Sequence, residues 1–406
     1  MYTKMKECKC CGSPSLKPIL DLNKQPLANN LVDEYDKYDT YELLLNLCEE
    51  CYHAQLSIAV DPQLLFSHYL YVSGTSQTLH REFDRVSKEL CDLYKEINSA
   101  QKTLPRISVL DVASNDGTFL KYFKLLGCTT LGIDPATNIC DMATESGIKT
   151  INGFFGSPEG ADLLGDKQFN IVTAFNVFAH IENPATFMAS VFNVLTDNGI
   201  CAIQTSQRDM FFNSQFDTIY HEHHHFYSIS SFNEVCRRNG FFIYDVKFPE
   251  IHGGSYLFII GKDKKLDRSK HFIETEREQG RYNPNLYKFF SQDINEKKEI
   301  NLKKLDQLVS QGYKLVGFGA AAKGIVLLNY YNLKLDYVVD ENPLKYNKTI
   351  PNVGAEIVSI EKAKELLSTS KKICFIILPW NFKKEINQKI NYHFNQDIET
   401  ICLIGN

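Results

Sequence analysis

The stretch Ile107-Ser-Val-Leu-Asp-Val-Ala-Ser-Asn-Asp-Gly-Thr118 decides the fold of this chain. Residues 107–111 predict a buried strand, and the small and polar residues after them predict a tight turn. We expect a helix from Gly117 to Leu126 and a second strand over 130–134. A strand, a turn and a helix that lead into another strand are typical of a parallel sheet.

The same alternation continues along the chain. Further strands are expected over 169–175, 199–204, 241–248 and 256–261, with helices over 185–195, from Ser231 onward, and from Arg268 to about Leu308. A second α/β unit then follows, with strands over 313–319, 335–340 and 373–378 and a helix over 320–330. The sequence therefore predicts the α/β fold class, with helices on both faces of a mostly parallel sheet.

Length and charge narrow the class of protein. A chain of 406 residues predicts two to three domains. The formal net charge of -5 offers no basic face for nucleic acid. No apolar run reaches the roughly 18 residues of a membrane helix, and the first residues lack the apolar core of a signal peptide. We therefore expect a cytoplasmic monomer that binds neither nucleic acid nor a membrane.

The N-terminal cysteines predict a metal site. Cys8 and Cys11 form one C-x-x-C pair, and Cys48 and Cys51 form a second. Two such pairs are typical of a four-thiolate zinc site, although Cys10 adds a fifth thiol to the first pair. A polar segment this short has little core, so zinc would supply much of its folding energy. The alternative is a group of buried thiols without a metal.

The turn after the first strand predicts a nucleotide site. It resembles the acidic-then-glycine loop of S-adenosylmethionine (SAM) methyltransferases, although it is not a G-x-G-x-x-G motif. A carboxylate at the end of the next strand can accept hydrogen bonds from both ribose hydroxyls. The alternatives are an NAD-type domain and a site without a ligand. The residues assigned to SAM are Asp111, Ala113, Ser114, Asn115, Asp116, Gly117, Asp134 and Asn176.

The run Tyr220-His-Glu-His-His-His225 suggests either a metal or proton transfer. His221 to His225 matches H-E-x-x-H, which binds zinc only when both histidines share one face of a helix. The surrounding residues lack a helical apolar stripe, so we expect an active-site loop with a histidine base. A zinc hydrolase and a purely structural histidine network remain alternatives.

Several motifs together resemble the three-domain sugar C-methyltransferases, and they span nearly the whole chain in the order of that family. They are Gln25-Pro-Leu-Ala-Asn-Asn30, Ser114-Asn-Asp-Gly-Thr118, Asn176-Val-Phe-Ala-His-Ile181, Asp217-Thr-Ile-Tyr-His-Glu-His223, His252-Gly-Gly-Ser255, Gly319-Ala-Ala-Ala-Lys-Gly324 and Leu378-Pro-Trp-Asn381.

The resemblance implies a zinc-binding domain over 1–60, a SAM-dependent methyltransferase domain with a helical lead-in over 61–300, and a Rossmann-like domain over 301–406. It implies C-methylation of a nucleotide-linked keto-deoxyhexose, with zinc in a structural role. The implied catalytic residues are His223 as the base, with Tyr220, Glu222 and His180.

The nucleotide-sugar substrate is expected to contact residues from three segments. In the C-terminal glycine-rich loop, Lys323 offers positive charge beside a helix N-terminus, which favours a diphosphate. The alternative for this loop is a helix-packing turn without a ligand. The residues assigned to substrate binding are Tyr71, Ser73, His252, Ser255, Gly319, Ala320 and Lys323.

Three rival functions remain open at this point. A sugar O-methyltransferase, in polysaccharide or antibiotic sugar biosynthesis, would need the same SAM site and a base but no keto group. A zinc-dependent binding or scaffold protein would not bind SAM. A metallohydrolase would hold its metal at the histidines.

Overall fold

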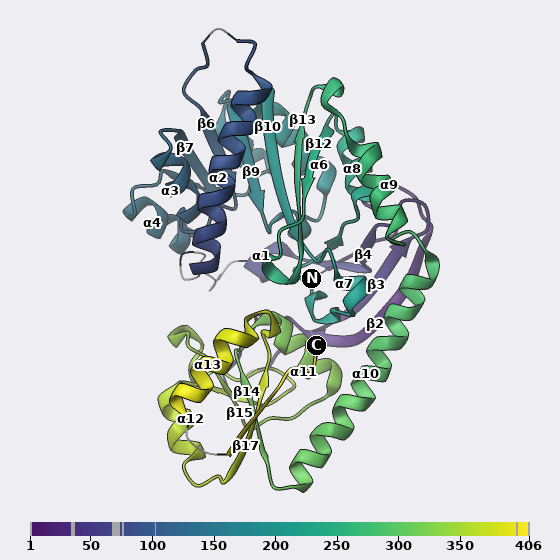
Figure 1. Ribbon diagram of the computed structural model, residues 1–406, viewed down its shortest axis with the longest axis vertical. Helices are drawn as coiled ribbons and strands as arrows, with labels where there is room; N and C mark the ends of the chain where they lie inside the picture. Colours follow the sequence, from purple (N-terminus) through teal and green to yellow (C-terminus); the bar gives the residue numbers. More distant parts are fainter. Residues whose placement is uncertain are drawn as a thin grey trace.

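The computed structural model describes residues 2–33, 37–66, 74, 77–101, 103–394 and 397–404. The described residues form three larger sheets and one two-stranded pair, and one long helix, α10 (Pro284–Ser310), runs beside the N-terminal sheet and the C-terminal domain (Figure 1). That helix passes through residue 300, near which the sequence places the start of the third domain.

The central sheet has seven strands. The strands from β10 to β8 run parallel, whereas β13 and β12 close the sheet in antiparallel order. Their order is β12 (Phe242–Lys247), β13 (Ser255–Gly261), β10 (Leu195–Ser206), β9 (Phe169–Phe175), β6 (Ser108–Val112), β7 (Thr129–Asp134) and β8 (Thr150–Asn152). The predicted parallel sheet with a closing antiparallel pair is confirmed.

Helices cover both faces of this sheet because the strands alternate their side chains. Val109 and Ile171 pack against α2 and α3 on one face, while Leu110 and Val172 pack against α6 and α8 on the other. Such strands are apolar on both faces, as buried parallel strands are. The helices are α2 (Gln77–Ile97), α3 (Thr118–Leu125), α4 (Thr137–Glu145), α5 (Pro158–Leu164), α6 (Pro184–Val194), α8 (Ile229–Arg238) and α9 (Ser269–Glu278).

Two predicted helix limits are wrong. Helix α8 begins at Ile229 rather than Ser231, because the hydroxyl of Ser228 caps it and forms a capping box with Ser231. The long charged helix is in fact two helices, α9 and α10, and Pro284 fits the first turn of the second.

The N-terminal sheet has four antiparallel strands, and its edge strand comes from the histidine segment. The order is β11 (His225–Phe226), β4 (Ala54–Leu56), β3 (Thr40–Cys48) and β2 (Leu16–Pro26). A separate pair joins β1 (Tyr2–Lys4) to β5 (Ile58–Val60), and short helices follow at α1 (Pro62–Phe66) and α7 (Met210–Asn213). The cysteine-rich segment and the histidine segment are therefore parts of one sheet.

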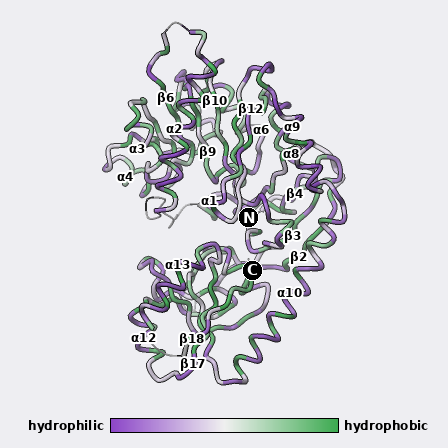
Figure 2. Tube along the Cα trace, viewed as in Figure 1, coloured by the Kyte–Doolittle hydropathy of each residue, from purple (hydrophilic) through white to green (hydrophobic). Residues whose placement is uncertain are grey.

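The C-terminal sheet is entirely parallel and confirms the second α/β unit. Its order is β16 (Glu356–Val358), β15 (Tyr337–Val339), β14 (Lys314–Phe318), β17 (Lys372–Ile377) and β18 (Asp397–Ile401), with helices α11 (Ala322–Tyr331), α12 (Ile360–Leu367) and α13 (Lys383–His393). Figure 2 shows hydrophobic colour along the inner strands and more hydrophilic colour along the outer helices. No helix in the described part of the chain combines the length and apolar character needed to cross a membrane.

Candidate active site

The turn from β6 into α3 has the backbone shape of a ligand-binding turn. Ala113, Asn115 and Gly117 all have positive φ, at 55°, 50° and 73°. At Gly117 a side chain would also overlap Ile148, 2.9 Å from the position of a Cβ. A non-glycine residue rarely adopts this conformation, and such strain gathers at functional sites.

Asp134 and Asp116 hold this turn in place. Asp134 Oδ2 accepts the N–H of Asn115 (3.0 Å), and its Oδ1 accepts the N–H of Ala136 (2.9 Å). Asp116 accepts the N–H of Thr118 through one oxygen and the N–H of Gly74 through the other, both at 3.1 Å. Each carboxylate oxygen has a second lone pair, so Asp134 can still accept ribose hydroxyls.

Asp111 lies buried behind the turn, where its Oδ1 accepts a hydrogen bond from the Thr173 hydroxyl at 2.6 Å. Burial, together with the negative charge of Asp134, raises the pKa of Asp111 to about 7. Burial also raises the pKa of Asp134. Two buried carboxyl groups this close together favour a positively charged ligand, which fits the sulfonium and ammonium groups of SAM.

Two further features fit the same ligand. The Ser114 hydroxyl is buried and has no hydrogen-bond partner among the described residues, so it is available to a ligand. Asn176 follows β9 at the same edge of the sheet, also with a positive φ of 55°. Its side-chain amide lies 3.2 Å from His252 Nε2. The structure therefore brings the eight residues assigned to SAM to one sheet edge, while their individual roles stay predictions.

His223 is held in one tautomer. Its Nδ1 lies 2.8 Å from the carbonyl oxygen of Thr218, which can only accept, and 3.2 Å from the side-chain amide nitrogen of Gln207. The shorter contact assigns the proton to Nδ1. Its Nε2 then has a lone pair and lies 2.9 Å from the Tyr220 hydroxyl, which donates to it. Burial and the nearby His180 hold the pKa of His223 well below its ordinary value. The imidazole is therefore neutral at physiological pH, and Nε2 is the nitrogen that can accept a proton.

His180 joins the histidine segment to the SAM side. Its ring packs edge-to-face on that of His223, with centroids 4.7 Å apart. The backbone of Glu222 and that of Asn176 also lie close to this ring. Burial lowers the pKa of His180 to about 4, so this ring is neutral too. Two of the other predicted catalytic residues, Tyr220 and His180, thus contact His223.

The fourth, Glu222, faces the N-terminal domain. Its Oε1 accepts a hydrogen bond from the Asn29 side chain at 2.5 Å, and burial raises the pKa of Glu222 to about 7. Asn29 has no assigned role from the sequence, although it lies in the Gln25–Asn30 motif. That motif is the feature of the sequence from which Asn29 could have been chosen as a site residue.

The other three histidines of the segment have no contact with His223 like those of Tyr220 and His180, and each lies in a different setting. His221 Nε2 lies 3.3 Å from the carbonyl oxygen of Tyr41, and His225 Nδ1 lies 2.9 Å from His53 Nε2. Neither ring nitrogen of buried His224 has a partner among the described residues. Since His225 lies in a strand, the i and i+4 histidines do not share a helix face, and the geometry of a metalloprotease is absent here.

The predicted zinc ligands do come together. The Sγ atoms of Cys8, Cys11, Cys48 and Cys51 all lie within 4.8 Å of one another, and two of the pairs are 3.5 Å apart. Four sulfurs at about 2.3 Å from a tetrahedral zinc would lie roughly 3.8 Å apart. The donor set and spacing therefore fit zinc. No other group of metal-ligand side chains in the described residues is close enough to hold an ion.

The zinc site is connected directly to the catalytic segment. Strand β4 begins three residues after Cys51 and pairs with β11, so that His225 faces Gln55. The carbonyl of His224 also accepts the N–H of Leu56 at 3.0 Å. The N-terminal sheet thus fixes the end of the segment that begins with Tyr220 and His223.

The remaining side of the site comes from the C-terminal domain. Lys323 Nζ donates to the carbonyl of His252 (3.3 Å) and lies 5.1 Å from the centre of the Trp380 ring. The indole N–H of Trp380 donates to Asp217 at 2.7 Å. Burial lowers the pKa of Lys323, an effect that Asp217 opposes. Asp217 and Trp380 lie in the recognised motifs but have no role assigned from sequence.

The other residues assigned to the substrate lie in different settings. Ser255 is buried and donates to the carbonyl of Ile251 at 3.0 Å. The N–H of Gly319 donates to Val339 (2.7 Å), and the backbone of Ala320 bonds to two side chains of its own domain. Tyr71 and Ser73 lie outside the described residues. Among the described residues assigned to the substrate, His252 and Lys323 contact each other, and His252 also lies beside Asn176.

Three family models match successive parts of the chain. One described as "Putative zinc binding domain" matches residues 8–66, one described as "Methyltransferase domain" matches 80–246, and one described as "C-methyltransferase C-terminal domain" matches 250–404. The C-methyltransferase NovU from Streptomyces niveus is 27% identical over 395 residues, which cover 94% of this chain and 91% of NovU.

The chain belongs to the three-domain C-methyltransferase family. This C-methyltransferase is accordingly a SAM-dependent enzyme with a zinc-binding N-terminal domain. A ubiquinone biosynthesis O-methyltransferase from Rickettsia bellii is 28% identical, but over only 120 residues, which are 29% of this chain and 49% of that protein.

Similar solved structures match only part of the C-methyltransferase. Magnesium protoporphyrin IX methyltransferase from Synechocystis PCC 6803, with bound SAM, is 11% identical with a TM-score of 0.36, covering 50% of this chain and 99% of that one. A SAM-dependent methyltransferase from Clostridium acetobutylicum is 12% identical with a TM-score of 0.34, covering 44% and 91%. At TM-scores this low, the similarity to these structures adds no evidence about the fold beyond the strand order described above.

Proposed function

We propose that the chain methylates a carbon atom of a nucleotide-linked sugar, next to a keto group. The observation that carries this proposal is the state of His223. Its Nε2 has a lone pair and lies beside the Tyr220 hydroxyl, while its Nδ1 lies beside the Thr218 carbonyl and the Gln207 amide. Such a group removes a proton from carbon when a keto group has made that C–H acidic.

The neighbours of His223 suit the oxygen of the resulting enolate. As the C–H bond breaks, its proton passes to Nε2 and its electron pair moves into the enolate. The Tyr220 hydroxyl, now released from Nε2, can donate to the enolate oxygen, and the His180 ring packs beside the same imidazole. Donors fixed where charge develops are a large source of catalysis.

SAM, when bound, supplies a methyl group to the carbon that has lost its proton. Asp111, Asp134 and the turn between them would hold it at the sheet edge. His180 contacts the backbone of both Asn176 and Glu222, so it links that edge to the histidine segment. Bringing the two substrates together in the right orientation is a large part of such catalysis.

Deuterium exchange tests the enolate separately from methyl transfer. Nucleotide-linked 4-keto-deoxyhexoses are incubated with the protein in D2O without SAM and followed by proton NMR. We expect exchange at the carbon beside the keto group. His223→Ala should lose this exchange and reduce kcat by about 10²- to 10⁴-fold, while calorimetry shows unchanged SAM affinity.

Two results would contradict the proposal. Full exchange and full turnover in His223→Ala would remove the base assignment. If labelled SAM transferred its methyl group to a sugar oxygen, without exchange at carbon, the protein would be a sugar O-methyltransferase instead.

A further inference from the structure

The side chain of Gln207 lies against the nitrogen of His223 that does not face Tyr220. Its amide nitrogen is 3.2 Å from His223 Nδ1, which also lies 2.8 Å from the Thr218 carbonyl oxygen. Gln207 is buried, and its Oε1 has no hydrogen-bond partner among the described residues. A buried polar atom without a partner is uncommon in a folded protein. Gln207 is not part of the motifs that resemble the C-methyltransferase family.

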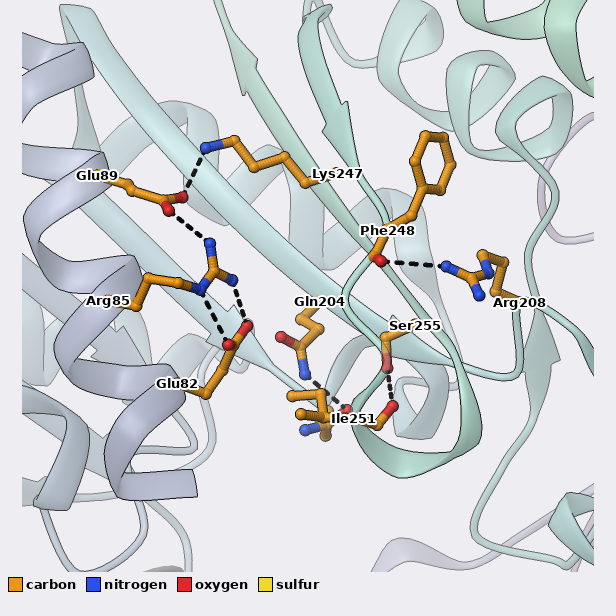
Figure 3. Close-up of polar contacts among 10 residues, drawn as sticks. Glu82, Arg85, Glu89, Gln204, Arg208, Lys247, Phe248, Ile251 and Ser255 are labelled. Atoms are coloured by element: carbon orange, nitrogen blue, oxygen red, sulfur yellow. Dashed lines mark hydrogen bonds and ion pairs between the residues drawn. The ribbon is translucent and has the colours of Figure 1, made fainter. Parts of the chain in front are cut away.

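The backbone around Gln207 is a fixed corner at the end of β10. The N–H groups of Gln207 and Arg208 both donate to the carbonyl of Gly254, at 3.1 and 3.2 Å. The guanidinium of Arg208 donates in turn to the Phe248 carbonyl at 3.2 Å (Figure 3). Gln207 itself has a φ of 91°, which residues with a side chain rarely adopt and which occurs mostly at functional sites. The fold therefore fixes where this amide lies.

The two neighbours of His223 Nδ1 require opposite protonation states. A backbone carbonyl only accepts, so Thr218 needs a proton on Nδ1, whereas an amide NH2 group donates and needs a lone pair there. The Thr218 contact is the shorter one, and a backbone oxygen cannot turn. The Gln207 amide can turn, because rotation about its last side-chain bond exchanges Oε1 and Nε2, which differ little in size. With the proton on Nδ1, the amide presents Oε1 to the ring.

We propose that Gln207 is a positioning residue, whose Oε1 accepts the Nδ1–H of His223 together with the Thr218 carbonyl. One N–H group shared between two acceptors is a common arrangement. Two acceptors on one side of the imidazole fix its plane, so that Nε2 and its lone pair stay beside the Tyr220 hydroxyl at 2.9 Å. The same contact gives the buried Oε1 atom a partner.

The contact matters most once His223 has taken up a proton. Burial holds the pKa of His223 well below its ordinary value, and His180, Lys323 and His224 act in the same direction. Acceptors that bind the charged ring oppose these effects. As the C–H proton passes to Nε2, Nδ1 keeps its own proton, so the ring becomes positive and its bonds to both acceptors strengthen. The catalytic part of this role rests on the proposed function, because that function supplies the proton.

Two substitutions separate the oxygen of Gln207 from its shape. Gln207→Met keeps the length of the side chain without the acceptor, whereas Gln207→Glu keeps an acceptor in either orientation. With SAM and a nucleotide-linked 4-keto-deoxyhexose, Gln207→Met should reduce kcat about 10- to 100-fold, as expected for a hydrogen bond to a charged group. KM and SAM affinity should not change. Gln207→Glu should retain most of the wild-type kcat.

NMR of protein labelled with ¹⁵N at histidine measures the contact without turnover. At neutral pH we expect the proton of His223 on Nδ1, in a signal identified by its loss in His223→Ala. Gln207→Met should move this N–H resonance upfield, because one of its two acceptors is gone, and Gln207→Glu should move it downfield. The matched control is Gln25→Met, which removes a similarly buried glutamine whose amide donates to the Leu22 carbonyl at 3.0 Å. It should change neither the resonance nor kcat.

Three results would overturn this role of Gln207. A proton on Nε2 of His223 in the wild type would mean that Gln207 donates to Nδ1. An unmoved resonance with full kcat in Gln207→Met would show that Thr218 alone orients the ring, and the proposed function would stand. Equal losses of kcat in Gln207→Met and Gln207→Glu would show that shape matters rather than the acceptor. If the wild type shows no exchange at carbon, the proposed function fails, while the resonance still decides whether Gln207 accepts from His223.

Discussion

The central and C-terminal domains build the same turn at the same edge of their sheets. In each, a carboxylate that follows the second strand accepts two backbone N–H groups through its two oxygens. One N–H belongs to the turn after the first strand, and the other lies two residues beyond the carboxylate. The central pairs are Asp134 with Asn115 and Ala136; the C-terminal pairs are Asp340 with Ala320 (2.7 Å) and Asn342 (2.8 Å).

The two turns differ in charge. Asp111 pairs with Gly132, which lies two residues before Asp134. In the C-terminal sheet the residue two positions before Asp340 is Val338, and it pairs with Gly317. Gly317 therefore occupies the position that corresponds to Asp111. The C-terminal turn therefore lacks the second buried acid. Its one carboxylate is also engaged by Lys345, whose Nζ lies 3.4 Å from Asp340 and 2.8 Å from the Ala320 carbonyl.

The two turns thus share these backbone hydrogen bonds, but only the central turn leaves its carboxyl groups available to a ligand. We call the central turn the open turn and the C-terminal turn the closed turn. The central turn keeps buried carboxyl groups and the Ser114 hydroxyl for a cationic ligand. The C-terminal turn neutralises its carboxylate from within, and its domain instead offers Lys323 and Trp380 to the domain junction. Backbone shape alone does not make a nucleotide site, because the charges around the turn decide whether a ligand can enter.

The largest expected effect is on turnover. It distinguishes the role of the open turn from that of the histidine segment, which the zinc-binding domain holds in place. Cys51→Ser, or removal of zinc by a chelator, should reduce turnover about 100-fold or more, because β11 loses the sheet that holds it next to His223. SAM affinity should stay within about twofold, since the open turn is built from the central sheet. Metal analysis, turnover and calorimetry on the same samples check this.

A zinc-free sample that keeps full turnover would show that the N-terminal sheet does not position the catalytic segment. A sample that loses SAM binding while remaining folded by circular dichroism would show that the open turn depends on the N-terminal domain.

The next effect compares the two carboxylates directly. Asp134→Asn should weaken SAM binding by roughly 10- to 100-fold, because hydrogen bonds to a charged group are worth about 1.5–3 kcal/mol. Asp340→Asn is the matched control, with the same hydrogen bonds in the other sheet, and it should leave SAM affinity unchanged. Calorimetry measures both. Equal losses in the two variants would mean that the C-terminal turn also takes part in SAM binding.

A smaller effect is the pH dependence of SAM binding. The pKa of Asp111 is raised to about 7 by burial and by Asp134, so the free protein holds a proton there below pH 7. A cationic ligand favours the ionised form, so SAM affinity should fall about tenfold between pH 8 and pH 6. Asp111→Asn should flatten this dependence, measured by calorimetry at each pH.

The raised pKa of Asp111 also affects the stability of the folded protein, but this effect favours low pH, whereas SAM binding favours high pH. Because the folded pKa of Asp111 exceeds its unfolded value of about 3.9, the folded state binds this proton more tightly. The resulting stability is present below about pH 4 and is lost as the pH rises through about 7.

A SAM affinity that does not change with pH in the wild-type protein would show that Asp111 does not face the cation.

Sequence patterns predict the long strands of the central sheet because each of them contains a run of buried, mostly apolar residues. The strands β6, β7, β9 and β10 are of this kind. The strands that the patterns miss include two short ones, β8 with three residues and β11 with two. They also include the longer β2 and β3 of the N-terminal sheet. A two-residue strand has no periodicity to detect, and β11 exists only because β4, far away in sequence, pairs with it.

The candidate site likewise contains residues that the sequence indicates and contacts that it does not indicate. The four cysteines and Asp111, Asp134 and His223 could be chosen from residue type, spacing and family motifs. The hydrogen bond from Asn29 to Glu222, the Trp380–Asp217 pair and the neutralisation of Asp340 by Lys345 depend on tertiary contacts between segments. No local pattern reports which of two similar turns is left open to a ligand.

The smallest expected effect concerns the closed turn. Lys345→Ala removes the ammonium from Asp340 and Ala320, and it should lower the stability of the protein by about 1 kcal/mol, because the pair is partly exposed. It should not create a second SAM site, since Gly317 still stands where the central turn has Asp111. Thermal unfolding measures the first expectation, and the stoichiometry of SAM binding by calorimetry measures the second. A stoichiometry that rises from one to two would mean that Lys345 alone had closed the turn, and that a buried acid at the position of Asp111 is not required.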